Sequence, residues 1–98
     1  MTLRVSVVSA EREVWSGDAR MVVARTLDGE IGILTGHVPT LSVLGAGEVR
    51  VDAESGEGLV ATVDGGFLSV EHDTVLVVAE RVSLGAGTGD RGAGGSPS

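Results

Sequence analysis

The chain contains 98 residues, which is enough for one domain with a modest hydrophobic core. A net charge of −7, with no lysine and only scattered arginines, argues against binding to nucleic acid or to an anionic lipid surface, because both need clustered cations. The absence of cysteine excludes disulfides, thiolate metal sites and cysteine nucleophiles.

The apolar residues are mostly aliphatic, with one Trp, one Phe and no Tyr, and valine is prominent among them. Valine packs well on a pleated sheet and loses rotamer freedom in a helix, so β-strands are favoured. In the first half of the chain, apolar and polar residues alternate at 3–7 and at 48–52 with the period of two typical of half-buried strands. The strands predicted there cover residues 3–7, 11–15, 19–26, 31–34, 41–44 and 48–52. Turns are predicted at Ser16-Gly17-Asp18, Asp28-Gly29 and Gly45-Ala46-Gly47, and a loop at residues 35–39.

The second half continues the same pattern, with strands predicted at residues 59–63, 67–70 and 74–79. Asp64-Gly65-Gly66 is predicted as a hairpin turn, and the apolar run at 74–79 as a last strand buried on both faces. Frequent short strands without helical periodicity predict an all-β domain, an antiparallel sandwich or flattened barrel. Because the C-terminal residues are rich in glycine and lack large apolar side chains, we predict a folded domain over residues 1–83 and a disordered tail over 84–98.

No combination of residues predicts a catalytic, cofactor or metal site. Residues 87–92 have the glycine spacing of a dinucleotide-binding loop, but the residues that follow cannot form the helix that this motif requires. His37 and His72 are too few for a metal site, and no Gly-x-Ser-x-Gly sequence presents a serine nucleophile. His72 is expected in a solvated turn. His37 has two interpretations: a functional loop residue, or a capped turn whose imidazole bonds to nearby backbone.

The run Gly29 to Leu41, GEIGILTGHVPTL, resembles the signature loop of the epsilon subunit of F-type ATP synthases. Further matches flank this run in the family's order, at residues 7–17 before it and at 47–51, 64–70 and 75–80 after it, so the resemblance covers about residues 2–82. Thr35 stands where the family usually has proline. The resemblance implies a ten-stranded β-sandwich of two sheets at the foot of the central stalk. There it would join the gamma subunit to the ring of membrane-embedded c subunits and turn with them.

The resemblance implies protein partners, and no catalytic role, cofactor or small-molecule substrate. Glu30 corresponds to the family's acidic residue that faces the polar loops of the c ring, although it could also be an ordinary turn residue. Gly36, His37 and Val38 belong to the family's Gly-His-x-Pro loop, near the gamma and c-ring contacts. Ser9 matches a residue on the gamma-facing side.

The C-terminus departs from the family pattern. Family members typically continue into a pair of helices that can inhibit ATP hydrolysis and that in some members binds ATP, whereas here residues 81–83 lead into the Gly-rich segment. We therefore expect the coupling role without auto-inhibition; the alternative is a stand-alone β-sandwich interaction module derived from the subunit. The chain begins without an apolar leader, and no apolar run approaches the ~20 residues that span a bilayer. A peripheral position at the cytoplasmic face of a bacterial cell membrane, within the synthase and without membrane insertion, is expected.

Overall fold

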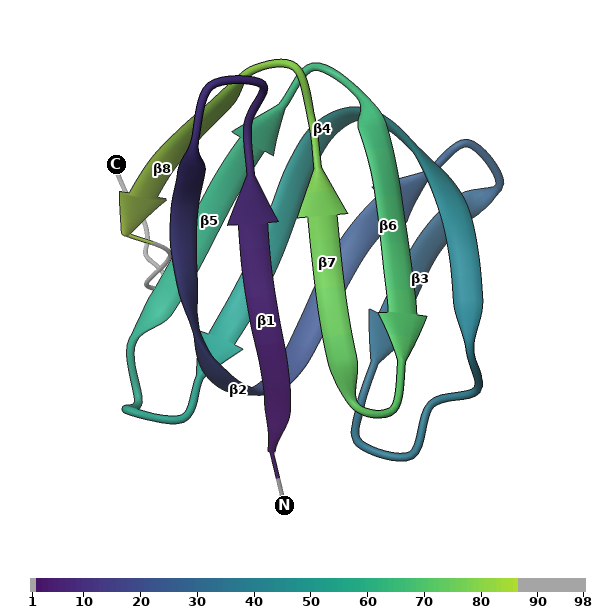
Figure 1. Ribbon diagram of the computed structural model, residues 1–98, viewed down its shortest axis with the longest axis vertical. Helices are drawn as coiled ribbons and strands as arrows, with labels where there is room; N and C mark the ends of the chain where they lie inside the picture. The colour runs from purple at the N-terminus through teal and green to yellow at the C-terminus, as the bar shows by residue number, and fades with distance from the viewer. Residues whose placement is uncertain (1, 87–98) are drawn as a thin grey trace.

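The computed structural model describes residues 2–86, which form eight β-strands and no helix (Figure 1). The prediction of an all-β domain is therefore confirmed for this part of the chain. The strands are β1 (Leu3–Val8), β2 (Glu13–Thr26), β3 (Gly29–Ile33), β4 (Thr40–Ala53), β5 (Gly58–Val63), β6 (Gly66–Glu71), β7 (Thr74–Val78) and β8 (Val82–Ala86).

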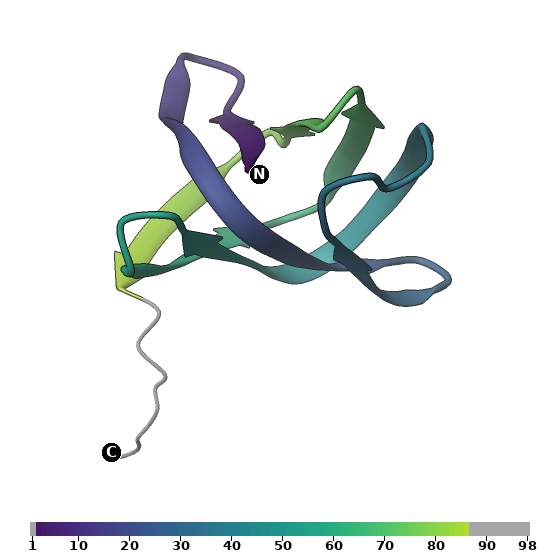
Figure 2. The ribbon, with the colours of Figure 1, turned by 90° about the horizontal axis from the view of Figure 1, so that it is seen from below.

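All eight strands belong to one sheet, in the order β3-β2-β1-β7-β6-β4-β5-β8. Strand β2 also pairs with β4, so the sheet closes on itself through β2, β1, β7, β6 and β4, and Figure 2 shows the resulting barrel-like curve from below. The paired strands are antiparallel except β1 and β7, which run parallel. Residues 2–86 therefore do not form the predicted ten strands in two separate sheets.

Two long, bent strands account for the lower strand count. Strands β2 and β4 each contain 14 residues and replace two predicted strands apiece. The predicted turn around Gly17 lies inside β2, where Gly17 pairs with Val5 of β1. The predicted turn at Gly45–Gly47 lies inside β4, where the pairing with β6 ends at Leu44 and the pairing with β5 begins at Gly47. Glycine bends these strands without ending them, so each strand passes from one side of the barrel to the other.

The predicted hairpin at Asp64-Gly65-Gly66 is wrong, because β5 and β6 do not pair with each other. Both run antiparallel to β4, one along each half of it, and because β4 bends between these halves, the arrows of β5 and β6 point in opposite directions in Figure 1. Gly65 and Gly66 have φ values of +132° and +127°, and these conformations bend the chain where β5 leads into β6. A Cβ atom on Gly66 would meet the backbone of Val78 and Ala79 at the end of β7, so glycine is required there.

The core inside the barrel is aliphatic and mostly valine, as the composition predicts. Its largest fully buried side chains are Leu3, Ile33, Leu68, Val5, Val7, Val22, Val49, Val51, Val70, Val75 and Val77, and no polar side chain within residues 2–86 is buried. Strand β7 was predicted to be buried on both faces, but Leu76 and Val78 are only half-buried because they lie on the outer face. Burial on one face is what the curved, single-layered wall of a barrel allows.

The last strand differs most from the prediction. Strand β8 was not predicted, since it contains only two large apolar residues among Ser, Gly and Ala. It pairs antiparallel with β5 from Val82 to Ala86 and so reaches beyond residue 83, the predicted end of the folded domain. The rest of the predicted tail, residues 87–98, lies outside the described residues, as does the glycine motif at 87–92.

Candidate partner-binding surfaces

One outer face of the barrel presents apolar side chains in register across four neighbouring strands. Val8 of β1 lies beside Val78 of β7, Val78 beside Phe67 of β6, and Phe67 beside Val43 of β4. Side chains alternate between the two faces of a strand, so these four point outward while Val7, Val77, Leu68 and Leu44 point into the core. Together with Leu41 and Leu76 they form a surface that we call the apolar face.

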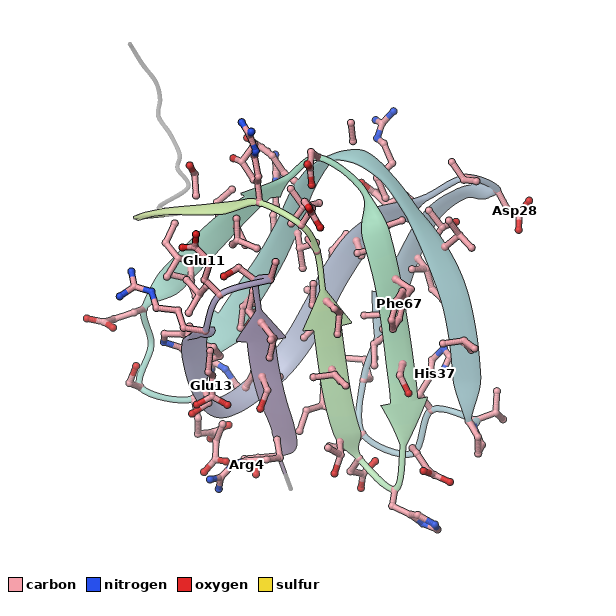
Figure 3. All side chains as sticks on the ribbon, turned by 45° about the horizontal axis from the view of Figure 1, so that its top comes forward. Arg4, Glu11, Glu13, Asp28, His37 and Phe67 are labelled. Carbon is pink, nitrogen blue, oxygen red and sulfur yellow. The ribbon has the colours of Figure 1, made fainter. Side chains whose placement is uncertain are left out.

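The apolar face is open to solvent at its β4 side. The exposed fractions of Leu41, Val43 and Phe67 are 74%, 58% and 45%, and the other members are half-buried. Phe67, the only phenylalanine of the chain, is labelled on β6 in Figure 3. Contiguous exposed apolar surfaces on small domains are common at protein-binding sites, so the apolar face is a candidate for such a contact.

The loop between β3 and β4, Leu34–Pro39, leads directly into the apolar face at Leu41. We call it the His37 loop. It adds two exposed apolar side chains, Leu34 and Val38, which are 56% and 68% exposed. Gly36 has a φ of +84°, a left-handed conformation that favours glycine, and its N–H donates to Oδ1 of Asp73 at 2.7 Å.

His37 makes local hydrogen bonds that shape this loop, through both its backbone and its side chain. Its backbone N–H donates to the Leu34 carbonyl at 3.2 Å, and its ring atom Nδ1 lies 2.8 Å from the Val38 carbonyl oxygen. A carbonyl oxygen can only accept, so Nδ1 carries a hydrogen in this arrangement. The second ring nitrogen, Nε2, is then an acceptor in the neutral imidazole. The imidazole therefore bonds to nearby backbone, as the capped-turn interpretation predicts, and no hydrogen bond of Nε2 occurs within residues 2–86.

The β2–β3 hairpin places Glu30 on a different outer face. The hairpin itself is confirmed, although its turn is Leu27–Asp28, one residue earlier than predicted. Glu30 pairs with Arg25 across the hairpin, and both line a shallow depression of about 280 Å³ with Glu48 and Arg50 of β4. Within residues 2–86 the Glu30 carboxylate forms no ion pair, whereas Arg50 contacts Glu48 at 3.5 Å. This charged face contrasts with the apolar face.

Ser9 occupies the tight connection between β1 and β2. Its hydroxyl accepts hydrogen bonds from the backbone N–H groups of Glu11 and Arg12, at 3.3 and 3.4 Å, and donates to the Arg12 carbonyl at 3.2 Å. Its own N–H donates to the same carbonyl at 2.8 Å. The Ser9 side chain thus stabilises its own turn, which accounts for a serine at this position without a partner.

The residues proposed from the sequence do not form one cluster. In Figure 3 the labelled Glu11, beside the Ser9 turn, Asp28, at the hairpin tip, and His37 lie at three separate places. Gly36, His37 and Val38 do share one loop. The sequence interpretation missed the apolar face, although its signal was present: Leu41 and Val43 alternate with residues of the opposite face, and residues 75–79 are apolar throughout.

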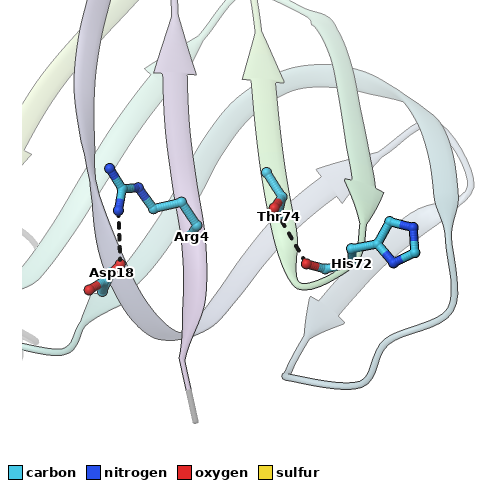
Figure 4. A network of polar contacts seen from close by, with 4 residues as sticks. All are labelled: Arg4, Asp18, His72 and Thr74. Atoms are coloured by element: carbon cyan, nitrogen blue, oxygen red, sulfur yellow. Dashed lines mark hydrogen bonds and ion pairs between the residues drawn. The ribbon is translucent and has the colours of Figure 1, made fainter.

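The turn between β6 and β7 contains His72, as predicted. His72 and Asp73 adopt φ values of +51° and +58°, both in the left-handed region, and Thr74 Oγ1 donates to the His72 carbonyl at 3.4 Å (Figure 4).

Figure 4 also shows Arg4 of β1 facing Asp18 of β2, with a separation of 3.8 Å between Nη1 and Oδ1. This exposed ion pair contributes at most about 1 kcal/mol.

Neither a metal cluster nor a membrane-spanning helix occurs in the part of the chain that the structure describes. Its residues contain no group of three or more His, Asp or Glu side chains placed to hold an ion. None of its segments is a helix long and apolar enough to cross a membrane.

Comparison with known families identifies the fold and its relatives. The family model described as "ATP synthase, Delta/Epsilon chain, beta-sandwich domain" matches residues 2–85. The chain belongs to this family. The resemblance to the epsilon subunit is confirmed over nearly the whole described region.

Bacterial epsilon chains are close in sequence to this epsilon-type chain. It is 55% identical to the "ATP synthase epsilon chain" of Frankia casuarinae over 85 residues, which are 86% of this chain and 99% of that protein. It is 53% identical to the Micrococcus luteus chain of the same name, covering 85% of this chain and 91% of the relative. The Streptomyces avermitilis epsilon chain is 46% identical, and the match covers 84% of this chain but 66% of the longer relative.

Solved structures support the fold. A chain from the Euglena gracilis mitochondrial ATP synthase, described as "OSCP/F1/c-ring in rotational state 1", matches with a TM-score of 0.80 at 22% identity, covering 85% of this epsilon-type chain and 53% of that chain. A chain from the "central stalk/cring" of the Tetrahymena thermophila mitochondrial enzyme matches with a TM-score of 0.67 at 18% identity, covering 85% and 66% respectively.

Proposed function

We propose that this epsilon-type chain is a non-catalytic subunit of the central stalk of an F-type ATP synthase. In this role it joins the gamma subunit to the c ring and transmits rotation between them during proton-driven ATP synthesis. The family membership supports the assembly, and the apolar face is the observation that carries the role. A coupling subunit must hold its neighbours through a stable contact, and an exposed apolar surface provides the burial that such a contact needs.

The gamma subunit is the proposed occupant of the apolar face. Leu41, Val43 and Phe67 would form the centre of this contact, because they are exposed and adjoin one another on β4 and β6. The His37 loop lies at its margin and would add Val38 and, as a hydrogen-bond acceptor, the Nε2 atom of His37, which has no hydrogen bond within residues 2–86. Ser9, in the β1–β2 turn, would lie at the periphery and contribute less, since its hydroxyl is already used within the turn.

The β2–β3 hairpin is the proposed contact with the c ring. Its turn residues Leu27 and Asp28 project from the barrel, and Leu27 is 72% exposed. Glu30 follows in β3 with an exposed carboxylate that suits an arginine on a polar loop of the ring. A second contact on a different part of the surface from the apolar face lets one small domain bridge two neighbours.

We further propose that the 98-residue chain couples without inhibiting ATP hydrolysis. Residues 2–86 contain no helix that could act on the catalytic sites, and the match to this chain covers 99% of the Frankia relative. Binding to gamma and the c ring would hold the chain peripherally at the cytoplasmic face of a bacterial membrane. Fractionation of cells tests this placement: the chain should sediment with membranes and be released together with the other extrinsic subunits.

Reconstitution tests the coupling role. Membranes are stripped of their own epsilon subunit, and the purified chain is added back in stoichiometric amounts. We expect recovery of proton-driven ATP synthesis and no decrease of the ATP hydrolysis rate. Failure to recover synthesis with a chain that is folded by circular dichroism would exclude coupling and favour the stand-alone interaction module. Recovery of synthesis with strong inhibition of hydrolysis would exclude only the absence of auto-inhibition.

A further inference from the structure

The β6–β7 turn has an unusual backbone for the residues it contains. His72 and Asp73, at φ values of +51° and +58°, both adopt the left-handed conformation of a two-residue hairpin turn, where Asn and Gly are the common choices. Asp and His are tolerated in this region better than most residues, but glycine would adopt it without strain. Asp73 is therefore held in a conformation that favours a different residue, and its side chain has a contact that glycine could not make.

Asp73 connects three segments of the chain. Its backbone carbonyl accepts a hydrogen bond from the N–H of Arg4 at the start of β1, at 2.8 Å. Its side-chain Oδ1 accepts the N–H of Gly36 in the His37 loop, at 2.7 Å. The second bond spans 37 residues of sequence and is charge-assisted, since the acceptor is a carboxylate.

The remaining polar contacts of the His37 loop are local. His37 N–H bonds to Leu34, and the His37 ring and Thr40 Oγ1 both bond to the Val38 carbonyl. Such bonds fix the shape of the loop but not its orientation relative to the barrel. Among the described residues, the Gly36–Asp73 bond is the one hydrogen bond that ties the loop to another element. It lies next to His37 and Val38, so it determines where these two side chains are presented.

We propose that Asp73 is the positioning residue of the His37 loop, and that it orders this loop for binding to the partner in the central stalk. This inference rests on the proposed function, which makes the loop a contact with gamma. Asp73 itself need not touch the partner. Its carboxylate fixes Gly36 in the left-handed conformation before binding, so the partner does not have to order the loop during association.

Two substitutions at the same position separate the carboxylate from the backbone conformation. Asp73→Gly removes the acceptor and keeps a residue that readily adopts the φ of +58°. Asp73→Asn keeps an oxygen at the Oδ1 position and also tolerates this conformation. His72→Gly is the matched control, because it adds the same backbone freedom to the turn and leaves the Asp73 side chain unchanged. Thermal unfolding of all three variants establishes that each remains folded.

Hydrogen exchange of the Gly36 amide is the readout that a general loss of stability would not reproduce. We expect Asp73→Gly to speed exchange of this amide by about tenfold, in line with the loss of one charge-assisted hydrogen bond. Amides of the core strands should keep their rates, His72→Gly should leave Gly36 protected, and Asp73→Asn, which keeps the acceptor oxygen without its charge, should give an intermediate rate. Unchanged exchange at Gly36 in Asp73→Gly would overturn the positioning role. This measurement uses the isolated chain and does not depend on any partner.

Binding to epsilon-depleted ATP synthase completes the test. We expect Asp73→Gly to bind several-fold more weakly than the parent chain, mainly through slower association, His72→Gly to bind as the parent does, and Asp73→Asn to lie between the two. Faster Gly36 exchange together with unchanged binding would show that the ordered loop is not used by the partner, and would overturn the proposal. If the parent chain itself did not bind, the proposed function would fail, and with it the role of Asp73 in binding; the exchange experiment would still decide whether Asp73 orders the loop.

Discussion

Replacing Gly66 with alanine should cost a large part of the domain's stability. Its Cβ would lie 2.9 Å from the Val78 carbonyl carbon and from Ala79 Cα, and closer still to the Val78 carbonyl oxygen. These are backbone atoms, held in place where Val78 pairs with Phe67, so no side-chain rotation relieves the contact. The φ of +127° adds strain of about 1–3 kcal/mol for any other residue, and the overlap adds about 1–3 kcal/mol more.

The expected total for Gly66→Ala is about 4 kcal/mol, against an unfolding free energy of about 5–10 kcal/mol for a domain of this size. At roughly 5 °C for each kcal/mol, the melting temperature should fall by about 20 °C. Circular dichroism during heating and urea titration measures both quantities. Gly32→Ala is the matched control, because its Cβ meets no atom within 4 Å and its φ is not in the left-handed region. Similar melting temperatures for the two variants would refute the reasoning about Gly66.

Three further substitutions test other parts of the structure. Gly17→Ala places a Cβ 2.9 Å from the indole of Trp15, so the ring must move; because Trp15 is the only tryptophan, its fluorescence emission should shift, and an unchanged spectrum would contradict the packing. Glu30→Lys should weaken attachment to the synthase by about fivefold at low salt and leave the melting temperature nearly unchanged, whereas a large loss of stability would assign Glu30 to the turn alone. Phe67→Thr keeps a strand-forming residue but removes the aromatic ring, so binding to the gamma subunit should weaken by about tenfold with folding retained. Equal affinity would exclude Phe67 from the contact.

The strands of this domain could be predicted well wherever apolar and polar residues alternate strictly. Leu3, Val5 and Val7 define a strand and its buried face without any tertiary information. The errors occur at glycines such as Gly17 and Gly47, because a glycine that ends a strand and a glycine that bends one have the same local sequence. Which of the two applies depends on pairing with a distant strand. The same long-range pairing makes β8 a strand in spite of its small residues.

In the candidate sites, too, local features could be predicted from the sequence, whereas contacts between distant residues could not. The His37 loop is visible in the sequence because Gly36 and Pro39 delimit it, and the exposed apolar positions Leu41 and Val43 could be inferred once β4 was known to have its core on the other face. The contact of Gly36 with Asp73 could not be predicted, since it joins residues 37 positions apart through a turn whose register only the folded sheet determines.

Site-directed cross-linking tests the central proposal most directly. The chain has no cysteine, so a single introduced cysteine can carry a photoreactive maleimide without side products on the chain. Three variants suffice: Val43→Cys on the apolar face, Asp28→Cys at the hairpin tip, and Thr62→Cys on the exposed outer side of β5 as a control. Each is reconstituted into epsilon-depleted synthase and illuminated. We expect Val43→Cys to join to the gamma subunit, Asp28→Cys to a c subunit, and Thr62→Cys to neither. A gamma product from Thr62→Cys with none from Val43→Cys would contradict the assignment of the apolar face, and the absence of any stalk product from all three would contradict the coupling role itself.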